Sequence, residues 1–221
     1  MSNPALDEYA KQKEDRAHQL SEIFRSAHTW DAMAISTANS APRNRLQESS
    51  VPLLAASYSI LFSIETLVSR HHLFAAELLC RPLLERVGLL YYFLQHEDGV
   101  GRWERGWEQS EPGRPSITNL VECIPAFKRP ESERYRKALI KRLHAVVHAD
   151  PIGHLRMLQE DGDGDVRIIS GPMPQNSRRY LEIANDIIIS AIALLNVTQD
   201  IFPEARWSEL GRVVSLGVRN A

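Results

Sequence analysis

Three ionisable side chains share one face of an otherwise apolar helix. Glu77, Arg81 and Glu85 are spaced four residues apart, and nearly every other position from Leu73 to Leu94 is apolar. An ionised group that leaves water must be paired, because its desolvation is costly. Two interpretations stay open. The three groups form an interior ion-pair network with a cation or donor from a facing helix, or they line a polar pocket that binds a ligand.

A second cluster lies in the segment RLHAVVHADPIGHL. His144 and His148 are four residues apart, a spacing that can present two imidazoles to one metal ion, and Asp150 and His154 follow closely. No glutamate-containing zinc motif is matched, however, and histidines near a helix C-terminus also cap free carbonyls. We therefore assign no metal and no cofactor to these residues.

The same segment resembles a nuclease motif. Arg142 and His148 are separated by five residues, which is similar to the Arg-x4–6-His motif of the HEPN superfamily of helical-bundle proteins, many of which are RNases of toxin–antitoxin and phage-defence systems. The resemblance implies that Arg142 stabilises the scissile phosphate and that His148 transfers a proton. The chain departs from the family at Leu143, where a polar residue is common.

A basic segment leads into this motif. Residues 128–142 carry seven basic and two acidic side chains, which could hold phosphates, with Lys137 and Lys141 lining a groove beside Arg142. The alternative is an ordinary solvated basic face of a helix.

A second resemblance combines both clusters. The strings LLCRPLLERVGLLYYFL and HAVVHADPIGHL resemble the pattern of a family of uncharacterised bacterial all-helical proteins, distantly HEPN-like and linked to abortive infection, over about residues 50–200. The resemblance implies that Arg81, Glu85 and His148 come together in the bundle. It implies no activity.

Helical periodicity dominates the elements that must position these residues. Residues 98–130 are expected to form an elaborated crossover with short helices, Val166–Ser170 a short extended piece, and residues 203–221 a short C-terminal helix. The expected long helices cover residues 4–38, 51–70 (capped by Ser50, with Pro52 in its first turn), 72–95, 131–148 and 176–201. The sequence therefore predicts an all-α bundle in a single domain, 1–221.

Composition excludes several classes of protein. The chain has 221 residues, 43% of them hydrophobic, and the apolar run Ile187–Val197 is too short to span a bilayer, so no membrane association is expected. The two cysteines lie in apolar helical contexts and the N-terminus lacks an apolar signal core, which favours a reducing, cytoplasmic location. A formal net charge of −2 gives no global nucleic-acid footprint, and no DNA partner is expected.

Three functions remain as hypotheses. The first is a cytoplasmic bacterial helical-bundle protein that acts by binding or self-association, as a homodimer or with an RNA or protein partner, because the helices at 51–70 and 72–95 carry more apolar surface than one chain can bury. The second is a metal-independent RNase that uses Arg142 and His148. The third is a small-molecule or metal pocket around Glu77, Arg81, Glu85, His144 and His148.

Overall fold

The molecule is an all-α bundle, as the helical periodicity predicts. The structure, a computed structural model, describes residues 4–40, 42–107, 113–148, 158–160, 166–168 and 178–205. The helices are α1 (Pro4–Ser40), α2 (Arg45–Ser69), α3 (Leu73–Gln95), α4 (Gly99–Glu104), α5 (Ile117–Cys123), α6 (Glu133–Val147) and α8 (Arg178–Ile201), with 3-10 turns at Pro125–Phe127 and Pro130–Ser132.

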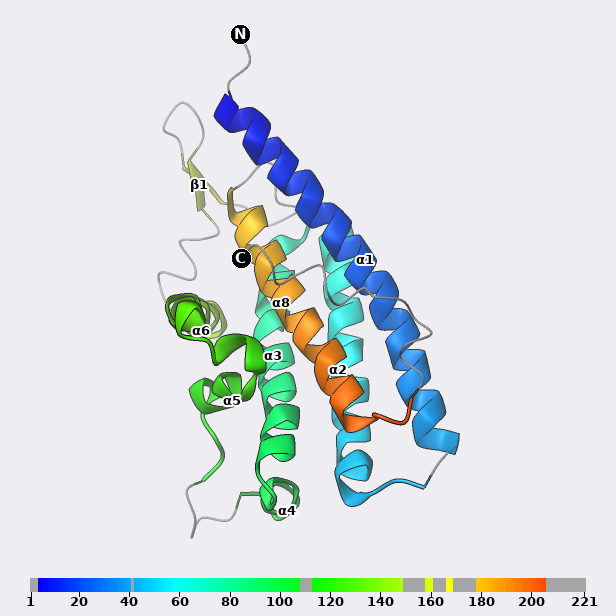
Figure 1. Cartoon of the computed structure of the whole chain (residues 1–221). Helices are drawn as coiled ribbons and strands as arrows, with labels where there is room; N and C mark the ends of the chain where they lie inside the picture. The colour runs from blue at the N-terminus through cyan, green and yellow to red at the C-terminus, as the bar shows by residue number, and fades with distance from the viewer. Residues whose placement is uncertain are drawn as a thin grey trace.

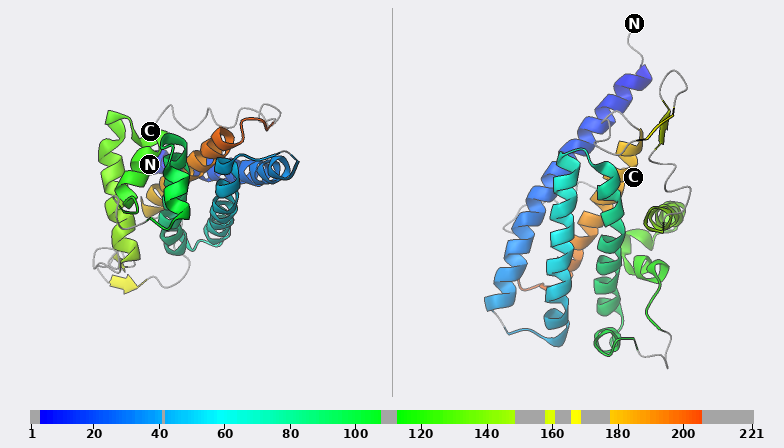
Figure 2. Two further views of the ribbon diagram at one scale, coloured as in Figure 1. Left: turned by 90° about the horizontal axis from the view of Figure 1, so that it is seen from below. Right: turned by 180° about the vertical axis from the view of Figure 1, so that it is seen from behind.

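Four long helices carry the core. α1 packs along α8, α2 along α3, and α8 also packs on α3, so that α3 and α8 together lie at the centre of the described bundle (Figure 1). The shorter helices α5 and α6 pack on the side of α3 that faces away from α2 (Figure 2). The largest fully buried side chains are Tyr58, Phe202, Leu61, Ile64, Leu73, Leu83, Leu84, Leu90, Ile124, Leu139, Ile183 and Ile187.

The start of α2 differs from the sequence prediction. The helix begins at Arg45 rather than at Val51, because Asn44 and Gln47 form a reciprocal cap: the Asn44 Oδ1 accepts from the Gln47 N–H (2.9 Å), and the Gln47 Oε1 accepts from the Asn44 N–H (3.1 Å). Ser50, expected to be the cap, is buried inside the helix. Pro52 consequently lies in the interior of α2, on its exposed side.

The crossover at 98–130 folds into short helices where it is described. α4 replaces the helix expected around Arg102–Trp107, and α5 with the following 3-10 turn replaces the one expected at 117–127. Ser116 caps α5 by accepting from the Asn119 N–H (3.2 Å). Residues 108–112 lie outside the described part of the chain.

A small β-hairpin was not expected. β1 (Leu158–Glu160) pairs antiparallel with β2 (Val166–Ile168), with Gln159 opposite Arg167. The sequence predicted only the second of these segments as extended, because three-residue strands are too short for a readable alternation. The C-terminal helix expected within residues 203–221 lies largely outside the described residues, which end at Ala205.

Two helices are long and apolar enough to cross a membrane by length and composition alone. For α8, 67% of the apolar window is buried inside the bundle, which is typical of the core helix of a soluble protein. For α2 only 28% of the window is buried. An uncharged part of the α2 surface is therefore left uncovered in the single chain.

α3 and α5 meet at a glycine. A Cβ at Gly88 would lie 2.6 Å from the backbone oxygen of Leu120, which is closer than any real carbon contact. The absence of a side chain at this position lets the α5 backbone rest directly on α3, and it thereby sets how the whole α5–α6 segment is placed.

We expect Gly88→Ala to destabilise the fold. Alanine favours a helix by up to about 1 kcal/mol over glycine, but overpacking against a backbone costs about 1–3 kcal/mol, and the clash should dominate. Urea unfolding followed by circular dichroism measures the difference. Gly113→Ala is the matched control, since nothing lies within 4 Å of a Cβ there. A Gly88→Ala protein as stable as the wild type would mean that α5 is free to shift.

Candidate functional site

Two fully buried carboxylates connect three helices. Glu77 on α3 and Asp186 on α8 each have an exposed fraction of 0%. Arg179 Nη2 donates to Glu77 Oε2 (2.8 Å), and Arg142 Nε lies 3.7 Å from Glu77 Oε1. Arg142 also donates through Nη2 to Asp186 Oδ2, and the Tyr135 hydroxyl donates to Asp186 Oδ1 (2.6 Å). These contacts, called here the buried network, join α3, α6 and α8.

Burial and charge pairing act in opposite directions on the pKa values of Asp186 and Arg142. Burial raises the pKa of Asp186, while Arg142 and the Tyr135 hydroxyl oppose that shift by stabilising the carboxylate. Burial lowers the pKa of Arg142, but the pairing with Asp186 outweighs burial and leaves it raised. The network thus brings the carboxyl groups of Glu77 and Asp186 against two guanidinium groups. Burial, with Asp186 and Glu77 nearby, also raises the pKa of the Cys80 thiol, which keeps it protonated.

The three charges singled out on α3 divide into two groups. Glu77 takes its partners from α6 and α8, in the buried network. Arg81 and Glu85 pair with each other, Nε to Oε1 at 3.0 Å, and Glu85 Oε2 also lies 3.7 Å from Arg114 Nη2. The side chains of Arg81 and Glu85 are 15% and 25% exposed, so this second group lies at the edge of the bundle.

Sequence reasoning missed three members of the buried network, namely Asp186, Tyr135 and Arg179. Asp186 was detectable, because it is a single carboxylate between Ile183 and Ile187 in an apolar helix, the same signal that identifies Glu77. Tyr135 precedes Leu139, Leu143 and Val146 at helical spacing, so the sequence marks it only as part of the apolar face of α6, and its hydroxyl has no signature there.

The outer face of α6 carries a line of basic side chains. Arg134, Lys137, Lys141, His144 and His148 follow one another at intervals of three, four, three and four residues, and all five are exposed. Of these, Lys137 has a carboxylate partner in Glu133 (2.6 Å). This row of three Lys and Arg side chains and two histidines is called the cationic stripe below.

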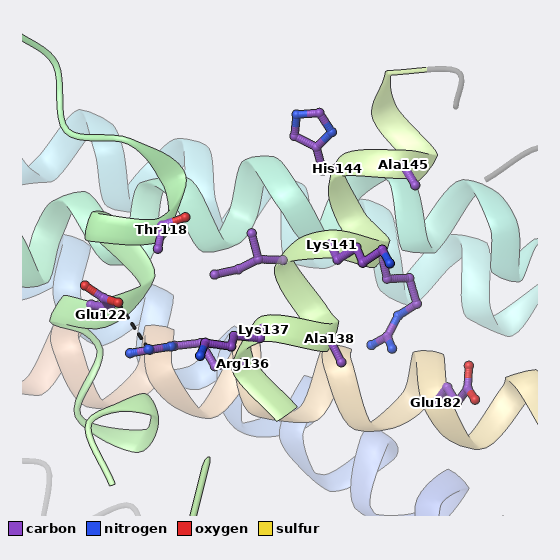
Figure 3. A pocket seen from close by; sticks show the side chains of 11 residues that line it. Thr118, Glu122, Arg136, Lys137, Ala138, Lys141, His144, Ala145 and Glu182 are labelled. Atoms are coloured by element: carbon purple, nitrogen blue, oxygen red, sulfur yellow. Dashed lines mark ion pairs between the residues drawn. The ribbon is translucent and has the colours of Figure 1, made fainter. Parts of the chain in front are cut away.

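A groove of about 770 Å³ runs beside the stripe. Figure 3 shows Thr118 and Glu122 of α5 on one side of it and Glu182 of α8 on the other, with the ion pair of Arg136 and Glu122 (3.1 Å) at one end. The residues that line it are Thr118, Glu122, Arg136, Lys137, Ala138, Ile140, Lys141, Arg142, His144, Ala145 and Glu182.

Arg142 and His148 lie on different sides of α6. They are six positions apart in the sequence, which leaves their side chains about 120° apart around the helix axis. Arg142 points toward the buried carboxylates, with 18% of its side chain exposed. His148 caps the C-terminus of α6 in the solvent, its ring centroid 4.2 Å from that of His144. His144, rather than His148, shares the groove with Arg142, Lys137 and Lys141.

His148 is also apart from the pair on α3. Among the described residues, no hydrogen bond or ion pair joins His148 to Arg81 or Glu85, and its ring contact is with His144. The convergence of these three residues that the second resemblance implied is therefore not seen here. The reason is the orientation of α6, which turns Leu139, Leu143 and Val146 inward and the histidines outward.

The histidine pair gains no third metal ligand in the described part of the chain. No group of three or more His, Cys, Asp or Glu side chains is placed there to hold a metal ion. Asp150 and His154, which follow the pair in sequence, lie outside the described residues.

Comparison of the chain with protein-family models, with curated proteins and with solved structures finds no match in any of the three.

Removing one carboxylate of the buried network should strongly destabilise the protein. In Glu77→Ala, Arg142 and Arg179 lose a buried counter-charge, and we expect the free energy of unfolding to fall by about 3–5 kcal/mol. Glu85→Ala is the control, because Glu85 is partly solvated and its loss should cost about 1 kcal/mol or less. Chemical denaturation monitored by tryptophan fluorescence measures both. Equal losses in the two variants would contradict the distinction drawn between the two ion-pair groups.

Proposed function

We propose that this chain is a non-catalytic RNA-binding protein of the bacterial cytoplasm, distantly HEPN-like and acting in a defence or toxin–antitoxin setting. The observation that carries the proposal is the cationic stripe on α6. Five exposed basic positions are aligned on one helix face with a groove beside them, while the opposite face of the same helix is fixed in the core.

The charge distribution supports an anionic partner although the whole chain is slightly acidic. The stripe extends over fifteen residues, or about 21 Å from its first residue to its last. Lys141 and Arg134 have no carboxylate within ion-pair distance among the described residues. Rows of basic side chains of this kind attract phosphate backbones, and releasing the condensed counterions drives the binding. Single-stranded RNA fits better than a duplex, because the adjoining groove offers Ile140 and Ala145 as apolar contacts for splayed bases.

The state of Arg142 supports binding without catalysis. An arginine that stabilises a scissile phosphate needs free donors aimed at the substrate. The guanidinium of Arg142 already bonds to Asp186 and lies beside Glu77, so its charge is neutralised inside the bundle.

An RNase is the second candidate, and one observation favours it. Arg142, Lys141 and His144 line the same groove, and the His148 ring lies against that of His144 in a tilted arrangement. A bound phosphate that drew Arg142 away from Asp186 would place a cation and an imidazole on one substrate.

Fluorescence anisotropy with a labelled single-stranded RNA of mixed sequence tests the binding proposal. We expect binding that weakens with salt, and we expect Lys141→Glu to weaken it further, with the slope of log K against log salt reduced by about 0.7 for each lost phosphate contact. The matched control is Lys11→Glu on α1, which makes the same change in net charge at an exposed position away from α6. Equal weakening by both variants would leave only non-specific attraction, and the proposal would be wrong.

Incubation of the same RNA with the protein in the presence of a chelator separates the two candidates. The binding proposal predicts intact RNA. If the RNA is cleaved, and if His148→Ala stops the cleavage without lowering the melting temperature, the RNase becomes the correct description. Because His148 is exposed, replacing it with alanine should not disturb packing, so a loss of cleavage would report on the imidazole itself.

A further inference from the structure

We propose that the outer face of α2 is the contact between two copies of this chain, packed antiparallel about a two-fold axis that passes beside Ser59. This inference is independent of the RNA proposal, because it concerns the opposite side of α3 from α6 (Figure 2).

The first observation is the lack of charge on this face. No charged residue occurs between Ser49 and Ile64, although the helix lies at the molecular surface with only 28% of its apolar window buried. In the view from behind, α2 lies in front of α8 and between α1 and α3 (Figure 2). A surface helix of a soluble monomer normally places charged side chains at such outward positions. Half-buried apolar side chains flank this face, namely Val51, Ala56, Phe62 and Leu67. One charged residue, Glu65, lies on the Phe62 side and pairs with His28 of α1 (2.9 Å).

Two hydroxyl groups on the outer face, on the C-terminal side of Ser59, are already satisfied. Ser63 Oγ donates to the carbonyl of Ser59 (2.8 Å), and Thr66 Oγ1 donates to the carbonyl of Phe62 (3.0 Å), both within α2. A hydroxyl bonded to its own helix loses little when water is removed. The face can therefore be covered at low cost by another apolar surface, although its residues are formally polar.

The symmetry of the exposed positions indicates which partner covers the outer face of α2. Counted from Ser59, the outward residues lie at equal distances in both directions: Ala55 and Ser63 at four, Pro52 and Thr66 at seven, Glu48 and Arg70 at eleven, and all are exposed. When two copies of a helix pack antiparallel about a two-fold axis, each residue meets the one at the same distance on the other side of the axis. Small residues then meet small residues, which allows a close approach of the two helices.

The charges at the two ends are complementary under the same operation. Glu48 of one copy meets Arg70 of the other, and the symmetry makes this contact twice, about 33 Å apart along the helix pair. Neither side chain has an ion-pair partner within the described part of its own chain. A parallel arrangement would instead bring Glu48 against Glu48 and Arg70 against Arg70. Both the shape and the charge of the face therefore fit a second copy of the chain in antiparallel orientation.

Sedimentation velocity with charge-swapped variants tests the orientation. We expect the wild type to dimerise, and we expect Glu48→Arg alone and Arg70→Glu alone to raise the dimer dissociation constant roughly tenfold, since each places like charges at both ends of the contact. The double variant should regain the wild-type dimer. It is the least favourable variant for α2 itself, because it reverses the charges that suit the helix dipole, so recovery cannot come from greater helix stability. A wild type that stays monomeric, or a double variant no better than the single ones, would overturn the proposal.

A cysteine at the symmetry axis tests the register. Ser59→Cys should form a disulfide-linked dimer on mild oxidation, because the two copies of this position face each other, and the native Cys80 and Cys123 are buried. Lys137→Cys, exposed on α6, is the matched control and should remain monomeric under the same conditions. Cross-linking of both variants to the same extent, or of neither, would contradict the contact at Ser59. Flotation of a monomeric protein with lipid vesicles would instead assign the face to a membrane.

Discussion

The two carboxylates of Glu77 and Asp186 have no access to water, and the rest of the architecture depends on how they are neutralised. α3 and α8 each carry one of them, and neither helix supplies enough cations by itself: Arg179 comes from the start of α8, and Arg142 comes from α6. Because Arg142 contacts both carboxylates, α6 cannot be removed or rotated without leaving buried negative charge. The network thus fixes the orientation of α6 on the core more specifically than the apolar side chains of α6 could by themselves.

Fixing the rotation of α6 also decides what the helix shows to solvent. Tyr135, Leu139, Arg142, Leu143 and Val146 face the bundle, so the positions between them face outward. These are the positions of Arg134, Lys137, Lys141, His144 and His148, and the cationic stripe is therefore the necessary complement of the buried network. Gly88 also helps to form this surface, because it lets α5 lie close enough to α3 to form the other wall of the groove.

Much of the fold could be predicted from the sequence, and the reasons for success and failure are physical. Long apolar periodicity located α1, α3, α6 and α8 to within a few residues. The start of α2 was missed because two motifs compete there: Ser50 followed by Pro52 is a good start signal, but the Asn44–Gln47 pair satisfies two backbone donors reciprocally and begins the helix earlier.

The candidate site was only partly readable. A charged residue in an otherwise apolar helix is easily recognised in the sequence. Glu77 could therefore be identified, and a cation facing it could be predicted. The identity of the cation could not be predicted from the sequence. The partners Arg142 and Arg179 lie 65 and 102 residues away from Glu77 in the sequence, and tertiary packing selects them. The Arg-x5-His spacing does not by itself specify how the two side chains are oriented, for a related reason. A spacer of five residues places two side chains in one segment, but the helical rotation between them turns one inward and the other outward.

The two surfaces of the molecule impose opposite requirements on a partner. The cationic stripe repels its own copy, so α6 is unsuited to an isologous contact and suited to a polyanion. The outer face of α2 has no charge along most of its length, which leaves nothing to attract a polyanion and nothing to repel a copy of itself. α3 separates the two helices, so that a dimer formed through α2 would leave both α6 surfaces accessible. Two stripes on one particle would then bind one RNA chain with a higher effective concentration than a single stripe provides, and a weak single-stripe affinity would suffice.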